Sequence, residues 1–265
     1  MKLLDFFTES KTGREETNED GIYFKEPFAA VIDGATSKDG KTYGNLSGGR
    51  FAAKCIMAAL ERISPEAEPI DLIQEINTAL RVEIENNNYE YGPSAVIVLY
   101  NDLRKELISY GDAPYSINGK KYAFKIESDL IASQRRAEII NQLLNSGASV
   151  EEIQKNDRGR EAITDFLRDA VKRCANVDAP HGYPVISGKN IVKSFVKIHK
   201  IRAGSEIILA SDGYPELFGC FSEAEAYLKE AIKKDVLCIK ELKGTKGVAF
   251  GNVSFDDRTY LRFIT

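Results

Sequence analysis

The stretch 28-FAAVIDG-34 contains five consecutive apolar residues and ends in Asp33 followed by Gly34. A second stretch, 207-IILASDG-213, repeats this pattern far along the chain, with Asp212 before Gly213. Short apolar runs that are bounded by glycine are typical of strands buried on both faces. Each stretch therefore predicts a buried strand that carries an aspartate at its end.

Further acidic residues lie at the edges of other predicted strands. They are Asp112 after a strand at 107–111, the pair Asp256 and Asp257 before the last strand, and the pair Glu19 and Asp20 before a strand at 21–24. If these edges meet, the carboxylates repel one another and must take up protons or bind cations. Carboxylates, carbonyls and water favour Mg²⁺ or Mn²⁺, whereas zinc would require histidine or cysteine ligands. The pattern therefore predicts a magnesium or manganese site.

The remaining patterns predict two groups of strands with helices between and after them. Strands are expected at 21–24, 28–32, 94–100, 106–110, 115–117, 122–126, 191–198, 206–210 and 259–264, and helices at 50–63, 71–86 and within 130–175. Asn118-Gly119 predicts a two-residue hairpin turn. Ser149 with Glu152, and Ser222 with Glu225, match the capping box that begins a helix. This order favours an α+β fold, and we expect one domain over residues 1–265.

Composition excludes several classes of protein. The 265 residues carry 36 basic and 40 acidic side chains, a net charge of −4, which does not indicate nucleic acid or an anionic membrane as a partner. The longest apolar run, near 95–100, is too short to cross a bilayer, and the charged start of the chain does not resemble a signal peptide. Four widely spaced cysteines predict free thiols in a reducing compartment. We therefore expect a cytoplasmic protein.

Six short motifs, in order along residues 14–259, together resemble the metal-dependent serine/threonine protein phosphatases of type 2C, the PPM family. They are Arg14 with Asn18-Glu19-Asp20, Val31-Ile32-Asp33-Gly34, Gly92-Pro93-Ser94-Ala95-Val96, Gly111-Asp112-Ala113-Pro114-Tyr115, Leu209-Ala210-Ser211-Asp212-Gly213 and Asp256-Asp257-Arg258-Thr259. Each motif is short, but their shared order is specific. The resemblance identifies the chain as similar to a divergent bacterial-type member.

The resemblance implies a central β-sandwich of two antiparallel sheets flanked by helices on both faces. It implies that Asp33 bridges two Mg²⁺ or Mn²⁺ ions, that Gly34 offers its carbonyl, and that Asp212 and Asp256 complete the shell of one ion. Glu19 or Asp20 would serve the second ion, Asp112 would help to hold a third, weaker one, and Arg14 would grip the substrate phosphate. A metal-bridging hydroxide would then hydrolyse phosphoserine or phosphothreonine in a protein substrate, with Asp33, Asp212 and Asp256 as the catalytic carboxylates.

The chain also departs from the family pattern. Arg14 lies one residue further from Asp20 than the pattern requires, and Ala35 stands where some members carry a histidine, so water would protonate the leaving group. Residues 130–190 match no family pattern, but they fall where the family carries its substrate-facing flap. We therefore expect a helical, flap-like insertion at roughly 130–190.

Three other readings remain open at this stage. A catalytically inactive, phosphatase-like module could bind metal or phosphoproteins, and a small phosphomonoester could replace a protein as substrate. A P-loop at 35–42 would need a helix directly after Lys41, but glycines follow instead. Cysteine-nucleophile and Gly-x-Ser-x-Gly patterns are absent from the sequence. The preference between Ser/Thr and Tyr phosphate, the choice of metal and the oligomeric state cannot be read from the sequence.

Overall fold

The computed structural model describes residues 1–37, 40–87, 92–174, 176 and 182–265. Within these residues, ten strands form two five-stranded sheets in which all paired neighbours are antiparallel. The first sheet has the order β1 (Lys2–Glu9), β12 (Arg258–Ile264), β11 (Glu206–Ala210), β8 (Tyr115–Ile117) and β9 (Lys120–Tyr122). The second has the order β10 (Lys197–Lys200), β7 (Glu106–Tyr110), β6 (Ser94–Asn101), β3 (Phe28–Ala35) and β2 (Gly21–Lys25).

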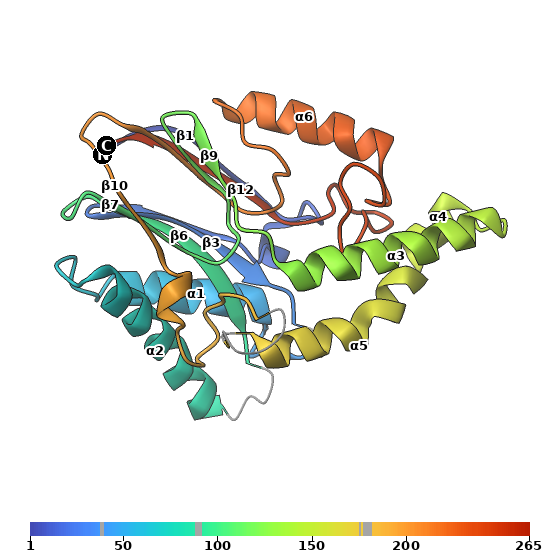
Figure 1. Cartoon of the computed structure of the whole chain (residues 1–265), viewed down its shortest axis with the longest axis horizontal. Helices are drawn as coiled ribbons and strands as arrows, with labels where there is room; N and C mark the ends of the chain where they lie inside the picture. Colours follow the sequence, from blue (N-terminus) through green and yellow to red (C-terminus); the bar gives the residue numbers. More distant parts are fainter. Residues whose placement is uncertain (38–39, 88–91, 175, 177–181) are drawn as a thin grey trace.

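Helices cover the outer faces of both sheets (Figure 1). Helices α1 (Gly48–Leu60) and α2 (Pro69–Asn87) lie on the second sheet, and α6 (Phe221–Lys234) lies on the first. Helices α3 (Glu127–Asn145), α4 (Val150–Lys155) and α5 (Arg158–Arg173) extend from one end of the sandwich. Short pieces complete the list: β4 (Thr42–Tyr43), β5 (Leu46–Ser47) and 3₁₀ turns at Glu15–Thr17 and Lys193–Phe195. The expected α-β-β-α layers are confirmed.

Strand β3 shows why its sequence is apolar throughout. Ala29 and Val31 lie in the core between the two sheets, whereas Ala30 and Ile32 pack in the core under α1 and α2. Strand β11 behaves in the same way, because Leu209 faces the other sheet and its neighbours pack under α6. A strand that is covered on both faces has no solvent side, so its residues do not alternate between apolar and polar. The continuous apolar composition of these two strands is thus a consequence of their position between two layers of the fold.

The first and last strands pair at one side of the first sheet. In this antiparallel ladder, Lys2 lies opposite Ile264 and Glu9 lies opposite Arg258, so the two ends of the described chain are neighbours (Figure 1). The sequence patterns did not predict β1. Its side chains are largely exposed, and Phe6 is 63% exposed, so the strand lacks the buried apolar signal on which the prediction depends.

Three local predictions were wrong. The strand expected at 122–126 is the shorter β9, which pairs with β8 across the confirmed Asn118-Gly119 turn. In the strand expected at 191–198, Ile191 instead packs against the core under α1 and α2, and β10 begins only at Lys197. The capping box at Ser149 is present, but Ser222 does not cap α6, because the helix already begins at Phe221 and the Glu225 carboxylate accepts from Arg258 instead.

Two further expectations can be compared with the structure. The four cysteines are free thiols, two of them buried and two partly buried, as expected. Across the described residues, no helix combines the length and the apolar character that crossing a membrane requires.

A buried arginine attaches helices α3 to α5 to the rest of the molecule. Arg136 on α3 is fully buried, and its Nε donates to Asp157 Oδ2 at 2.9 Å. Its Nη1 donates to the carbonyls of Leu237 at 2.9 Å and Gly244 at 3.2 Å. A buried guanidinium must have such acceptors, because desolvating an unpaired charge is costly. One side chain therefore connects α3, the start of α5 and the loop after α6.

We predict that Arg136→Ala lowers the free energy of unfolding by about 3 kcal/mol, because it leaves the Asp157 carboxylate and several carbonyls without their partner. The neighbouring Arg135 is exposed and stacks over Phe166, so Arg135→Ala should cost less than about 1 kcal/mol. Urea denaturation of both variants measures the difference. Equal losses would show that Arg136 does not anchor these helices.

Candidate active site

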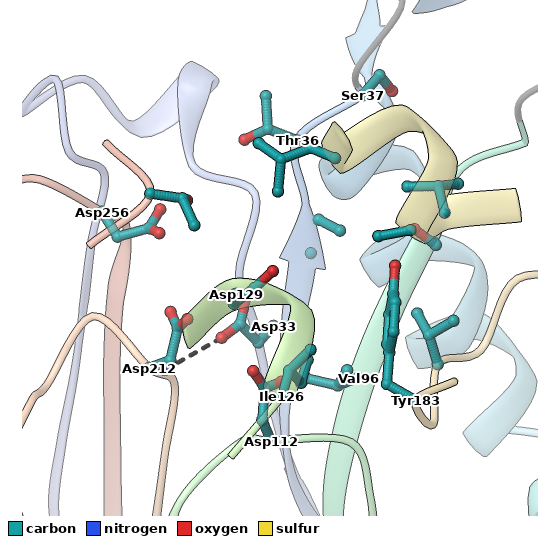
Figure 2. A pocket seen from close by; sticks show the side chains of 18 of the residues that line it. Asp33, Thr36, Ser37, Val96, Asp112, Ile126, Asp129, Tyr183, Asp212 and Asp256 are labelled. Atoms are coloured by element: carbon teal, nitrogen blue, oxygen red, sulfur yellow. Dashed lines mark hydrogen bonds between the residues drawn. The ribbon is translucent and has the colours of Figure 1, made fainter. Parts of the chain in front are cut away.

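A cavity of about 420 Å³ opens where the ends of the two sheets meet helices α3 and α5 (Figure 2). Five aspartates line it: Asp33, Asp112, Asp129, Asp212 and Asp256. Much of the remaining lining is apolar, and it includes Val96, Ile126, Leu167, Val171, Tyr183 and Val185. The cavity thus combines a concentration of carboxyl groups with an apolar surface.

The topology explains why acidic residues that are distant in sequence meet here. Strands β3 and β7 both run antiparallel to β6, so their ends, with Asp33 and Asp112, lie at the same edge. In the other sheet, β11 and β12 are antiparallel, so the end of β11 at Asp212 lies beside the start of β12 at Asp256. Strand β2 is antiparallel to β3, which brings Asp20 to this edge as well.

A hydrogen bond joins the two sheets at this edge. The backbone N–H of Asp212 donates to Asp33 Oδ2 at 3.1 Å, shown as the dashed line in Figure 2. Asp33 therefore belongs to one sheet by its backbone and contacts the other by its carboxylate. This contact fixes how the two predicted strand-end aspartates face each other.

The aspartates raise one another's pKa values. Desolvation raises the pKa of Asp33 well above its usual range, and the neighbouring Asp212 and Asp20 carboxylates raise it further. Desolvation and Asp212 do the same to the pKa of Asp112. Desolvation, followed by the charge of Asp256, raises the pKa of Asp212 to about 6. A group of carboxylates that holds protons in this way gains free energy when a cation replaces those protons.

Two lysines partly neutralise one side of the group. Lys246 Nζ lies 2.6 Å from Asp256 Oδ2, and Lys11 Nζ lies 3.0 Å from Glu19 Oε2 and 3.1 Å from Asp257 Oδ2. Burial tends to raise the pKa of Asp256, but Lys246 and Lys11 outweigh it and hold that pKa below its usual value. The lysines therefore act mainly on the side of Asp256, and the raised pKa values are those of Asp33, Asp112 and Asp212.

Glu19 and Asp20 lie behind the cavity wall, and neither lines the cavity itself. Both are buried, and among the residues that the structure describes, Glu19 Oε1 and Asp20 Oδ2 have no hydrogen-bond partner. Burial raises the pKa of Asp20 to about 8, against the effect of a hydrogen bond with Ser211. Buried carboxylate oxygens normally have partners, so these two atoms fit a bound cation in chemistry.

Gly34 lies in a place that admits no side chain. A Cβ atom there would come within 2.2 Å of the Glu19 carbonyl oxygen and 2.5 Å of the Gly49 carbonyl oxygen. The backbones of β3, the segment before β2 and the start of α1 therefore meet directly beside Asp33. This close approach gathers several backbone carbonyls near the carboxylates.

The oxygen atoms at this edge fit Mg²⁺ or Mn²⁺ in chemistry, because carboxylates and carbonyls are the ligands these ions prefer. Among the described residues, however, no three potential ligand side chains already converge tightly enough to hold an ion. Ion binding would therefore draw these side chains closer together, because the cation displaces their protons and offsets the repulsion between the resulting carboxylates.

Arg14 does not line the cavity. Its side chain is 65% exposed and its Nε lies 3.8 Å from Glu16 Oε1, a surface ion pair. Its role in phosphate binding therefore remains a prediction from the sequence that this arrangement does not favour. The extra residue between Arg14 and Asp20 in the sequence is consistent with this position of Arg14 outside the cavity.

Sequence patterns missed several cavity residues. Asp129 lies in the first turn of α3, where acidic residues are common because they complement the helix dipole, so nothing marks it as special. Arg160 and Lys246 lie in segments without a recognisable motif, and Lys11 precedes the first motif. Asp129 and Arg160 reach the site because α3 and α5 pack over the sheet edge, whereas Lys11 and Lys246 come from the segments after β1 and α6.

The P-loop reading is wrong. After Lys41 the chain forms the short strands β4 and β5, and α1 begins only at Gly48, capped by the Ser47 side chain. A P-loop requires a helix directly after its lysine, so that the helix N-terminus faces the phosphates. Residues 38–39 of this segment lie outside the described residues.

No protein-family model and no curated protein matches the chain. Solved structures do match it. The serine/threonine phosphatase PstP/Ppp of Mycobacterium tuberculosis is 17% identical, with a TM-score of 0.51 over 98% of this chain and 97% of that one. Serine/threonine phosphatase Stp1 of Staphylococcus aureus is 15% identical, with a TM-score of 0.51 over 100% of this chain and 95% of that one. At these identities the likeness concerns the fold, and it confirms the sandwich that the motifs implied.

We predict that the metal-free Asp212→Asn variant melts about 2–4 °C higher than the wild type at pH 7.5. The pKa of Asp212 is raised from 3.8 to about 6, so the folded state binds more protons than the unfolded state between these values. The wild type therefore loses stability as the pH rises through this range. Because Asp212 is exposed, solvent screens its charge, and we reduce the expected gain in the free energy of unfolding to about 1 kcal/mol.

Thermal melting in EDTA at several pH values tests this expectation, and the gain should vanish below about pH 4. Asp102 serves as a matched control, because Lys105 and Tyr100 hold its pKa below the usual value despite partial burial. Asp102→Asn should therefore lower the melting temperature at pH 7.5. A destabilised Asp212→Asn protein at that pH would contradict the repulsion described above.

Proposed function

We propose that the chain is a metal-dependent phosphatase that hydrolyses phosphomonoesters, with phosphoserine and phosphothreonine in proteins as its substrates. One observation carries the proposal: strand-end aspartates from both sheets surround a single cavity, in a fold also found in bacterial serine/threonine phosphatases. A merely structural cluster would not be expected to accumulate so many carboxylates with raised pKa values at the mouth of a cavity.

In this proposal, each residue has a role that follows from its position in the cavity. We propose that Asp33, Asp212 and Asp256 hold one Mg²⁺ or Mn²⁺ ion, and that Asp33 with the Gly34 carbonyl and Glu19 or Asp20 holds a second. Asp112, whose pKa the charge of Asp212 helps to raise, would support a third and weaker site. Such ions, when bound, supply an activated water and neutralise charge on the phosphoryl oxygens. The aspartates orient the ions, and the Asp212 amide keeps the Asp33 carboxylate turned toward the other sheet.

The apolar wall of the cavity has its own part in the proposal. Val96, Ile126 and Tyr183 exclude water from one side of the site, which strengthens electrostatic interactions inside it. Helices α3 and α5, which lie largely within the region 130–190 expected as a flap-like insertion, form part of the cavity lining. In this proposal they belong to one phosphatase-like domain of residues 1–265 and face the substrate. Its free thiols agree with a cytoplasmic location.

We predict that the protein hydrolyses p-nitrophenyl phosphate and a phosphothreonine peptide with Mn²⁺ or Mg²⁺, and that EDTA abolishes turnover. Asp33→Asn and Asp212→Asn should each lower kcat by about 100-fold or more while the fold is kept, because each removes a charged ligand. Asp102→Asn is the matched control, since Asp102 lies in the β6–β7 turn at the opposite edge of the sheet.

A phosphotyrosine peptide measured in parallel tests the preference for serine and threonine. Absence of turnover with either metal, in a folded protein that still binds Mn²⁺, would refute the enzyme and favour the inactive binding module. Full activity of Asp212→Asn with unchanged metal dependence would refute the assignment of the site.

A further inference from the structure

A cavity that binds a phosphoryl group needs a cationic side chain beside its aspartates, because the phosphoryl oxygens are negatively charged. The side chain expected for this task, Arg14, is at the surface and is not part of the cavity lining. Lys246 lines the cavity, but it lies 2.6 Å from Asp256 Oδ2. Arg168 lies at the wall and pairs with Asp165 on its own helix.

Arg160 has the position that Arg14 lacks. It lies in the first turn of α5, is partly buried and lines the cavity. Desolvation lowers its pKa, while the nearby carboxylates of Asp129 and Asp256 act against this effect. A guanidinium remains protonated under such conditions, so Arg160 places a permanent positive charge opposite the aspartates.

Two contacts hold Arg160 in place. The Asp157 side chain caps α5 and accepts a hydrogen bond from the Arg160 backbone N–H at 2.8 Å. At the other end, Arg160 Nη1 donates to the Thr245 carbonyl at 3.1 Å. Within the described part of the chain, this is the guanidinium's only hydrogen bond, which leaves Nε and Nη2 available to a ligand. The side chain is therefore oriented without being neutralised by a direct ion pair.

The same contacts connect Arg160 to the aspartates. Asp157 also binds the buried Arg136, which holds the loop that continues through Thr245 to Lys246 and its partner Asp256. Movement of Arg160 relative to Asp256 is thus resisted from both the helix and the loop. Such fixed geometry is what a residue needs to bind a group that must be positioned accurately.

We propose that Arg160 is the residue that binds the phosphoryl group of the substrate, in place of Arg14. The inference rests on the proposed phosphatase function of the same cavity. Two N–H groups of a guanidinium match two oxygens of a phosphoryl group, and the apolar wall beside Arg160 strengthens this contact. Substrate recognition and the helices α3 to α5 are then linked through one side chain.

The test measures binding of inorganic phosphate by calorimetry, with saturating Mn²⁺, to the full chain. Arg160→Gln should weaken phosphate binding by about 10- to 100-fold and raise KM for p-nitrophenyl phosphate, while Mn²⁺ affinity in the absence of phosphate changes less than about twofold. Arg158→Gln is the matched control, because Arg158 is exposed two residues earlier in the same helix and does not line the cavity. It should leave phosphate binding unchanged.

Unchanged phosphate affinity in a folded Arg160→Gln protein would overturn the inference, as would a loss confined to Arg14→Gln. If Arg160→Gln does not fold, Arg160→Lys keeps the charge without the planar fork, and wild-type phosphate affinity in that variant would also overturn it. Because phosphate binding needs no turnover, the two proposals separate. An inactive wild type whose phosphate binding depends on Arg160 would refute only the phosphatase function.

Discussion

The packing of the two sheets against each other is the constraint on which the site depends. Val31 and Leu209 lie in the inter-sheet core, each a short distance along its strand from an aspartate. When these residues pack, the strands are fixed in relative position and their ends are brought to the same edge. The energy that concentrates like charges therefore comes from apolar burial, which is large enough to offset repulsion among partly solvated carboxylates. The acidic cavity is a consequence of the core beneath it.

The sequence was most informative where burial is complete. Strands at 28–32 and 206–210 are covered on both faces, so their composition alone distinguishes them, and the acidic residues that end them could be identified. Strand β1 escaped prediction because its exposed side chains are stabilised by pairing with β12, an interaction 250 residues away that no local pattern records. The same limit applies to Ser222, whose expected partner Glu225 is engaged by Arg258 from a distant strand.

Of the candidate site, only the aspartates at the ends of strands could be predicted from the sequence. Asp33, Asp112, Asp212 and Asp256 follow or precede strands, and antiparallel pairing places such positions at a common edge. Asp129 and Arg160 reach the cavity because α3 and α5 pack over that edge, and this packing depends on Arg136 and on a loop after α6. Tertiary contacts of this kind produce no regular residue spacing in the sequence, so they could not be predicted from it.

The pairing of β1 with β12 has a practical meaning for work with the molecule. Lys2 and Ile264 are opposite each other, whereas β12 begins beside Asp256, so both ends of the described chain lie at the side of the sandwich remote from the cavity. A fluorophore, a purification tag or a solid support attached at either end would leave the carboxylates and the helices over them accessible. Joining the two ends by a short linker would likewise permit the chain to be reopened elsewhere, for example in the exposed turn at Asn118-Gly119, with the cavity intact.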